Sequence, residues 1–202
     1  MRSATRIAGV ALASLAAIST ISGCSSPPSR FYMLAATARP EGAAPAAYGV
    51  VIDGVGIPAV VDRSQFVVQQ GPNRVLIDEF NRWAAPLGAS VARTVAENLV
   101  VLLANPRIVS GPLAPSFDPA YRVTIDVQRF ESISGEAATL DALWVVRQGV
   151  TSSSGRTTVR EPVRGEGYDA LAAGHSRAIA SLSRDIAAVI RELRALQNPN
   201  AP

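Results

Sequence analysis

The sequence predicts an α/β fold, in which a mixed β-sheet is covered by two main helices within a single domain. Two observations carry this prediction. Segments rich in β-branched residues, several with strict alternation of apolar and polar residues, occur in two groups along the chain. Each group is followed by a segment with apolar residues at helical spacing, at about 88–104 and 168–196. Strands grouped in this way with amphipathic helices favour helices packed on a sheet.

The first group contains strand-like segments at 30–35 and 48–55, separated by an Ala-, Pro- and Gly-rich loop at 36–47. Two further β-rich runs within 65–80 flank Gly-Pro-Asn, which predicts a hairpin with its turn at 71–73.

The helix at 88–104 is predicted by apolar residues that recur every three or four positions. They are Leu87, Val91, Val95, Leu99 and Leu102. Ser90 is our candidate for its N-cap, because a serine hydroxyl can accept a free N–H of the first turn.

The second group begins with an alternating strand at 121–130, in which Val123, Ile125 and Val127 share one face. A second strand at 136–148 should pair with it, and 156–163 offers a third. The helix at 168–196 follows. Its apolar stripe contains Leu171, His175, Ile179, Leu182, Ile186, Val189 and Leu193.

The first 23 residues have the three-part layout of a secretory signal peptide. Arg2 and Arg6 give a positive start, an uncharged run spans 7–21, and two small residues precede Cys24. The uncharged run is shorter than the roughly 20 residues that a membrane-spanning helix needs. We therefore predict a signal peptide at 1–23, followed by a polar tether at 24–29.

Cys24 is the only cysteine, and Ile-Ser-Gly-Cys at 21–24 resembles the lipobox of bacterial lipoproteins. The resemblance implies cleavage before Cys24, a diacylglyceryl group on its sulfur and acylation of the new amine, with chains such as palmitate. In Gram-negative lipoproteins, an aspartate directly after the lipidated cysteine resembles a signal for retention in the inner membrane. This sequence has Ser25 at that position, which points to the outer membrane, with the domain on the periplasmic face. The alternative is an ordinary signal peptide with a chance cysteine at the cleavage site.

Charge and metal-ligand counts exclude several classes of protein. The mature chain would carry seventeen arginines against sixteen acidic residues, since the nineteen basic residues are all arginine and two lie in the signal peptide. A net charge of +1 does not describe a nucleic-acid-binding surface. With Cys24 acylated, His175 is the only remaining Cys or His, so we expect no structural zinc site. An all-oxygen calcium or magnesium site is not excluded in this way, but no Asp-rich loop suggests one, and we expect no metal or cofactor.

Candidate catalytic residues are few, and each has a plainer explanation. His175 lies on an apolar helical stripe, where a buried structural histidine is the usual case. Asp78 and Glu79 are neighbours on a strand and point to opposite faces. Glu161 and Glu166 fit a solvated loop. No pair of nucleophile and base stands out, so we expect no enzymatic activity and no catalytic residues.

The segment 58–103, "PAVVDRSQFVVQQGPNRVLIDEFNRWAAPLGASVARTVAENLVVLL", resembles the ABC-type transport auxiliary lipoproteins, the PqiC-like family. "YML" at 32–34, "LDALWVV" at 140–146 and "GYDALAAGHSRAIASLSRDIA" at 167–187 extend the resemblance over nearly the whole mature chain. It implies an auxiliary lipoprotein domain at 30–197, with a disordered tail at 198–202. The sequence departs from the family's pattern at Gly174-His175, where a small residue and a glutamine are expected.

The resemblance implies a function in transport across the cell envelope. The family accompanies MCE-type ABC systems that move lipids or other hydrophobic molecules between membranes, so the expected partners are the membrane and a periplasmic MCE-family protein. A homo-oligomer is compatible with the sequence. Two other hypotheses stay open: a lipid-anchored enzyme acting on peptidoglycan or lipid, and a free-standing ligand-binding lipoprotein.

Asp62, Arg63, Arg82 and Trp83 are the candidate partner-binding residues. Arginine and tryptophan are enriched at interface hot spots. The structural alternative, which the pattern favours, places Trp83 in the core where the hairpin meets the helix and pairs Arg82 with Asp78 or Glu79.

Overall fold

The computed structural model describes residues 26–45, 48–111 and 117–197. The predicted signal peptide, Cys24 and the tail at 198–202 lie outside the described residues. The described residues form eight strands and two helices. In chain order they are β1 (Arg30–Tyr32), β2 (Val50–Gly56), β3 (Gln65–Gly71), β4 (Arg74–Trp83), α2 (Leu87–Leu102), β5 (Ile108–Ser110), β6 (Tyr121–Ile133), β7 (Ala137–Gln148), β8 (Thr151–Pro162) and α3 (Gly167–Gln197).

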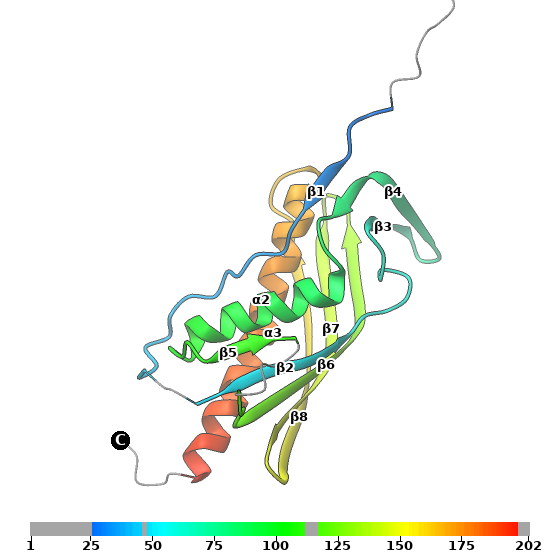
Figure 1. Ribbon diagram of the computed structural model, residues 1–202. Coiled ribbons are helices and arrows are strands. Elements are labelled where there is room, and N and C mark those ends of the chain that lie inside the picture. Colours follow the sequence, from blue (N-terminus) through cyan, green and yellow to red (C-terminus); the bar gives the residue numbers. More distant parts are fainter. Residues whose placement is uncertain (1–25, 46–47, 112–116, 198–202) are drawn as a thin grey trace, which may run out of the picture.

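The strands form one mixed sheet, covered by α2 and α3 (Figure 1). β6, β7 and β8 make an antiparallel meander, and β2 joins the other edge of β6 in parallel. The β3–β4 hairpin is attached to the far end of β6 through a single pairing, Gln69 with Ile133. The predicted α/β architecture, with a mixed sheet and two main helices, is confirmed.

Alternation in β6 and β7 sets the face on which the helices pack. Val123, Ile125 and Val127 are buried, as the sequence predicted, while the residues between them are exposed. In β7 the buried face carries Leu140, Ala142, Trp144 and Val146. Both helices pack on this side, so the opposite side of β6–β8 is not covered by either of them.

The N-terminus of α2 differs from the prediction. The helix begins at Leu87, with Pro86 at the N-cap position and no side-chain cap. Ser90 lies inside the first turn, where its N–H already donates to the Pro86 carbonyl. Pro86 has the extended backbone of an N-cap residue, with φ −50° and ψ 131°, and Ser90 is buried against the core instead of capping.

Two glycines allow close packing around β7 and β8. A Cβ on Gly155 would lie 2.3 Å from Trp144, whose ring crosses β8 at that point. The ring is fixed there because its Nε1 donates to Thr157 Oγ1 at 3.0 Å. Gly174 brings α3 close to β7, since a Cβ there would meet Ala138 at 2.9 Å.

The segment after β1 is held to both helices by side-chain hydrogen bonds. Asn98 of α2 accepts the N–H groups of Thr37 and Ala38 at 3.0 and 2.9 Å. Ser176 of α3 accepts the N–H of Ala35 at 3.1 Å. This extended segment therefore runs across α2 and α3 on the outside of the helical layer (Figure 1).

Candidate functional site

The β3–β4 pairing brings together the two segments that sequence analysis singled out for partner binding. Gln65 lies opposite Arg82 in the ladder, and the Trp83 N–H donates to the Ser64 carbonyl at 2.7 Å. The loop that carries Asp62 and Arg63 therefore ends beside the last residues of β4. These two segments are some twenty positions apart in the sequence and adjacent in the fold.

Arg82 is held by Glu79, one of the two partners that the sequence allowed. Its Nε donates to the Glu79 carbonyl at 2.7 Å, and its guanidinium lies 3.3 Å from the Glu79 carboxylate. Gln65 also reaches that carboxylate, at 3.4 Å. Arg82 is thus preorganised at the surface, with part of its guanidinium open to solvent.

Trp83 lies in the core, with 6% of its surface exposed. Its ring stacks on Phe66 with centroids 4.3 Å apart. This position fits the structural interpretation of Trp83, in which the ring closes the core where the hairpin meets the helix. Asp62 and Arg63 are exposed, and Asp62 borders a shallow hollow of about 300 Å³ beside the start of α2.

Asp78 organises a bulge in β4 that the sequence did not predict. The register shifts between Gln65 and Phe66, so that Glu79, Phe80 and Asn81 form extra length in β4. Asp78 Oδ1 accepts the N–H groups of Phe80 and Asn81, both at 2.8 Å, and its Oδ2 accepts the hydroxyl of Tyr168 at 2.6 Å. Burial alone would raise the Asp78 pKa, but these hydrogen bonds outweigh it and hold the pKa at about 2.

Tyr168 connects this bulge to the start of α3. Burial raises the pKa of its hydroxyl, and the hydrogen bond to Asp78 raises it further. Its ring packs against Phe66 and Tyr32 with centroid separations of 5.1 and 5.8 Å. The end of β4 that carries Arg82 therefore packs on a cluster of aromatic rings.

His175 and Ser132 form a hydrogen-bonded pair that sequence analysis missed. Ser132 Oγ lies 2.8 Å from His175 Nε2, and the imidazole stacks on Phe130 at 3.8 Å between centroids. Both residues are buried, and within the described residues His175 Nδ1 has no hydrogen-bond partner. Burial lowers the His175 pKa to about 3, so the ring is neutral near pH 7.

The Ser132–His175 pair lacks two features of a catalytic serine. Among the described residues no acidic group orients the imidazole through Nδ1, and the two side chains are closed off from solvent. The pair instead fixes β6 to α3 within the core. The expectation that His175 is buried is therefore confirmed, and its contact with Ser132 is one that no sequence pattern indicated.

A long open groove of about 950 Å³ separates the segment after β1 from α3. One wall is formed by Phe31, Met33, Ala35 and Pro40. The other is formed by α3 and the loop before it. That wall carries three arginines, Arg164, Arg177 and Arg184, above the small residues Ala173 and Ala180. Sequence analysis missed the groove because it exists only where 31–41 crosses α3.

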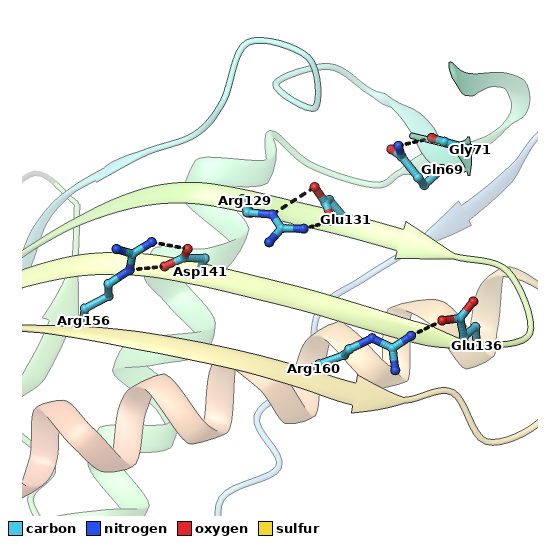
Figure 2. A network of polar contacts seen from close by, with 8 residues as sticks. All are labelled: Gln69, Gly71, Arg129, Glu131, Glu136, Asp141, Arg156 and Arg160. Atoms are coloured by element: carbon cyan, nitrogen blue, oxygen red, sulfur yellow. Dashed lines mark hydrogen bonds and ion pairs between the residues drawn. The ribbon is translucent and has the colours of Figure 1, made fainter. Parts of the chain in front are cut away.

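The uncovered side of β6–β8 is lined by ion pairs (Figure 2). Arg156 makes two hydrogen bonds to the Asp141 carboxylate, at 2.8 and 2.6 Å. Arg129 pairs with Glu131 at 2.7 Å, and Arg160 pairs with Glu136. Nearby, the Gln69 side-chain amide donates to the Gly71 carbonyl before the hairpin turn. Because these charges compensate one another, the face is polar without a strong field of one sign.

Neither a metal cluster nor a helix suited to a bilayer occurs in the described residues. In that part of the chain, no three His, Cys, Asp or Glu side chains gather closely enough to hold a metal ion. Among the same residues, neither helix combines the length and apolar character required to cross a bilayer.

The fold is that of a single-domain α/β protein, with a mixed sheet covered by two helices. The chain belongs to the family described as ABC-type transport auxiliary lipoprotein component, whose model matches residues 32–187.

Solved structures support the fold. A protein from Xanthomonas campestris superposes with a TM-score of 0.68 at 20% identity, covering 84% of this chain and 99% of its own. A second, described as an uncharacterized protein, gives a TM-score of 0.65 at 20% identity, covering 81% of this chain and 99% of its own. No curated protein matches the sequence.

Proposed function

We propose that this chain is a non-enzymatic accessory of an MCE-type ABC transport system that moves lipids or other hydrophobic molecules between membranes. Its acylated Cys24 anchors it in the outer membrane, and the domain faces the periplasm. The observation that carries the proposal is the family match over 32–187, which begins eight residues after the cysteine of a lipobox-like sequence. Acyl chains on one residue anchor a protein firmly, since each buried CH₂ contributes about 0.8 kcal/mol.

The proposed docking edge consists of Asp62, Arg63 and Arg82. Arg82 offers a guanidinium that Glu79 already holds in place, so less side-chain entropy is lost when it binds a partner carboxylate. Asp62 and Arg63 lie on the adjoining exposed loop. Trp83 supports this edge from beneath through its stack on Phe66.

Capture of the partner from membranes tests the proposal. The lipoprotein is purified from detergent-solubilised membranes of its own organism, and co-purifying proteins are identified by mass spectrometry. We expect a periplasmic MCE-family protein of an ABC transporter. Alanine at both Arg63 and Arg82 should lower its recovery about tenfold, as loss of hot-spot residues does.

Arg147→Ala is the matched control, because it removes one exposed arginine from the end of β7. It should leave recovery unchanged. If the Arg63→Ala/Arg82→Ala variant loses thermal stability and binding in proportion, the two arginines are structural and the docking edge is wrongly assigned. A wild-type protein that recovers no MCE partner but turns over peptidoglycan or a lipid would contradict the transport function itself.

Replacement of Cys24 tests the anchor separately. Cys24→Ser should abolish incorporation of labelled palmitate and prevent cleavage after Gly23. If the variant is still labelled and still fractionates with the outer membrane, the lipobox interpretation is wrong.

A further inference from the structure

Large apolar side chains are exposed at the end of the domain where the tether begins. Phe31 and Met33 are each 64% exposed, whereas Tyr32 and Leu34 between and after them are buried. Strand alternation therefore places one pair of residues in the core and the other pair on the surface. β1 pairs with the end of β4, and Phe80 of β4 is also an exposed apolar residue.

The groove that begins at Phe31 and Met33 has a cationic opposite wall. Counted over both walls, four arginines and three acidic residues line the groove. Arg177 is paired with Glu161 at 3.1 Å, and Glu41 is paired with Arg191 outside the lining at 3.0 Å. Once these pairs are set aside, Arg39, Arg164 and Arg184 are the remaining cations of the groove, and Asp169 is the remaining carboxylate. Within the described residues none of these three arginines has a carboxylate at ion-pair distance.

The bilayer lies within reach of this end of the domain. Phe31 follows Cys24 by seven residues, which span at most about 25 Å when fully extended. In Figure 1 the described residues before β1 lead away from the domain at the same end as the β3–β4 hairpin and the start of α3. The leaflet that holds the acyl chains therefore faces Phe31 and Met33 before it faces any other part of the groove.

We propose that the groove binds phospholipid of the leaflet in which Cys24 is anchored. Phe31 and Met33 contact the acyl-chain boundary, and Arg164, in the loop before α3, binds the headgroup phosphate. A guanidinium matches phosphate oxygens in a two-point hydrogen bond, and its long stem can lie along apolar surface while the charge stays at the headgroups. The proposal rests on acylation of Cys24, which keeps the groove at the membrane surface. It adds a lipid-contacting role to the proposed transport accessory.

Photo-crosslinking in cells tests this contact on the full chain. Phe31→p-benzoylphenylalanine keeps an aromatic side chain and adds a photoreactive ketone, and Ala188→p-benzoylphenylalanine places the same probe at an exposed site near the far end of α3. After irradiation, the purified lipoprotein is analysed by mass spectrometry. We expect phospholipid adducts from the probe at position 31, at least several-fold above those from position 188.

Arginine variants test the phosphate contact in the same experiment. Arg164→Ala should lower the lipid adduct at position 31 several-fold, and Arg147→Ala should leave it unchanged. Equal adduct yields from the wild type and both variants would overturn the role of Arg164. Adducts only to a second copy or to another protein would overturn the lipid as occupant, and so would the absence of any adduct at position 31.

The same spectra distinguish failure of this inference from failure of the proposed anchor. The N-terminal peptide reports acylation of Cys24 directly. If it is acylated and position 31 captures no lipid, the groove inference alone is wrong. If it is unmodified, the proposed anchor is wrong, and the proposal that the groove binds phospholipid of the leaflet in which Cys24 is held is overturned with it.

Discussion

The two sides of the β6–β8 meander contribute to the stability of the fold in different ways. On the side covered by the helices, Val123, Leu140 and Trp144 meet α2 and α3 in a core closed to solvent. On the other side, the same strands carry ion pairs among exposed side chains (Figure 2). Burial of apolar area contributes about 25 cal/mol per Å², whereas an exposed ion pair contributes about 0–1 kcal/mol. We infer that the covered side provides most of the stability of the fold.

Truncation of the core should give the largest effect. Leu182 of α3 is fully buried, and Leu182→Ala removes apolar contacts and leaves a cavity. We expect a loss of about 2–5 kcal/mol in the free energy of unfolding, measured by chemical denaturation. The matched control is Leu143→Ala on the open side, where the leucine is 44% exposed. Comparable losses in the two variants would contradict the contrast between the two sides.

The next effect concerns pH and the buried imidazole. His175 has a pKa of about 3 in the folded protein and about 6.5 when unfolded, so the unfolded state binds the extra proton between these values. Stability should therefore fall as pH decreases from about 6.5 towards 3, by up to about 1.4 kcal/mol per pH unit. His175→Gln can keep a hydrogen bond to Ser132 and does not titrate. We expect a flatter profile from this variant, and an unchanged profile would show that other groups cause the slope.

The Asp141–Arg156 pair is intermediate in solvent exposure between the buried core and the exposed ion pairs. The Asp141 side chain is 5% exposed and that of Arg156 is 60% exposed. Hydrogen bonds from Arg156 lower the Asp141 pKa, so the pair stabilises the fold above the ordinary carboxyl range, and this contribution is lost as pH falls below it. Arg156→Ala should lower the midpoint of urea unfolding at pH 7 more than Arg129→Ala does. Equal midpoints would show that Asp141 needs no cation.

The smallest effect is expected at the exposed pair between Arg129 and Glu131. Arg129→Ala should change the free energy of unfolding by no more than about 0.5 kcal/mol, because a solvated ion pair contributes little. Any difference from wild type should shrink as salt is raised from about 0.05 to about 0.5 M. A larger loss that persists in salt would mean that the open side contributes to the core after all.

Local patterns in the sequence predicted most of the fold. Strict alternation identified the buried face of β6, and Gly-Pro-Asn identified the β3–β4 turn, because both depend only on neighbouring residues. The prediction was less accurate at the end of β4 and at the start of α2. The bulge at Asp78 depends on Tyr168, ninety positions away, and proline took the N-cap position expected for Ser90.

The candidate site was predicted only in part. Asp62, Arg63 and Arg82 are at the surface, and Trp83 is in the core, as the structural alternative favoured by the sequence pattern had it, but its stacking partner Phe66 could not be read from the local sequence. The Ser132–His175 pair joins residues 43 positions apart, and the groove requires 31–41 to cross α3. Such contacts follow from the tertiary arrangement, which single-sequence periodicity does not specify.

The parallel pairing of β1 with the end of β4 also has a mechanical consequence. The chain that leads to Cys24 leaves from β1, whose residues Arg30 to Tyr32 lie beside Asn81 to Trp83, and the Ala84 N–H donates to the Tyr32 carbonyl at 2.9 Å. A pull transmitted from the membrane along this strand would load its hydrogen bonds together in shear, and would not peel them apart one at a time. Beyond them, the load would pass through Thr37 and Ala38 to Asn98. With Cys24 anchored as proposed, thermal movement of the envelope would thus act on an edge strand that hydrogen bonds connect to the helical layer.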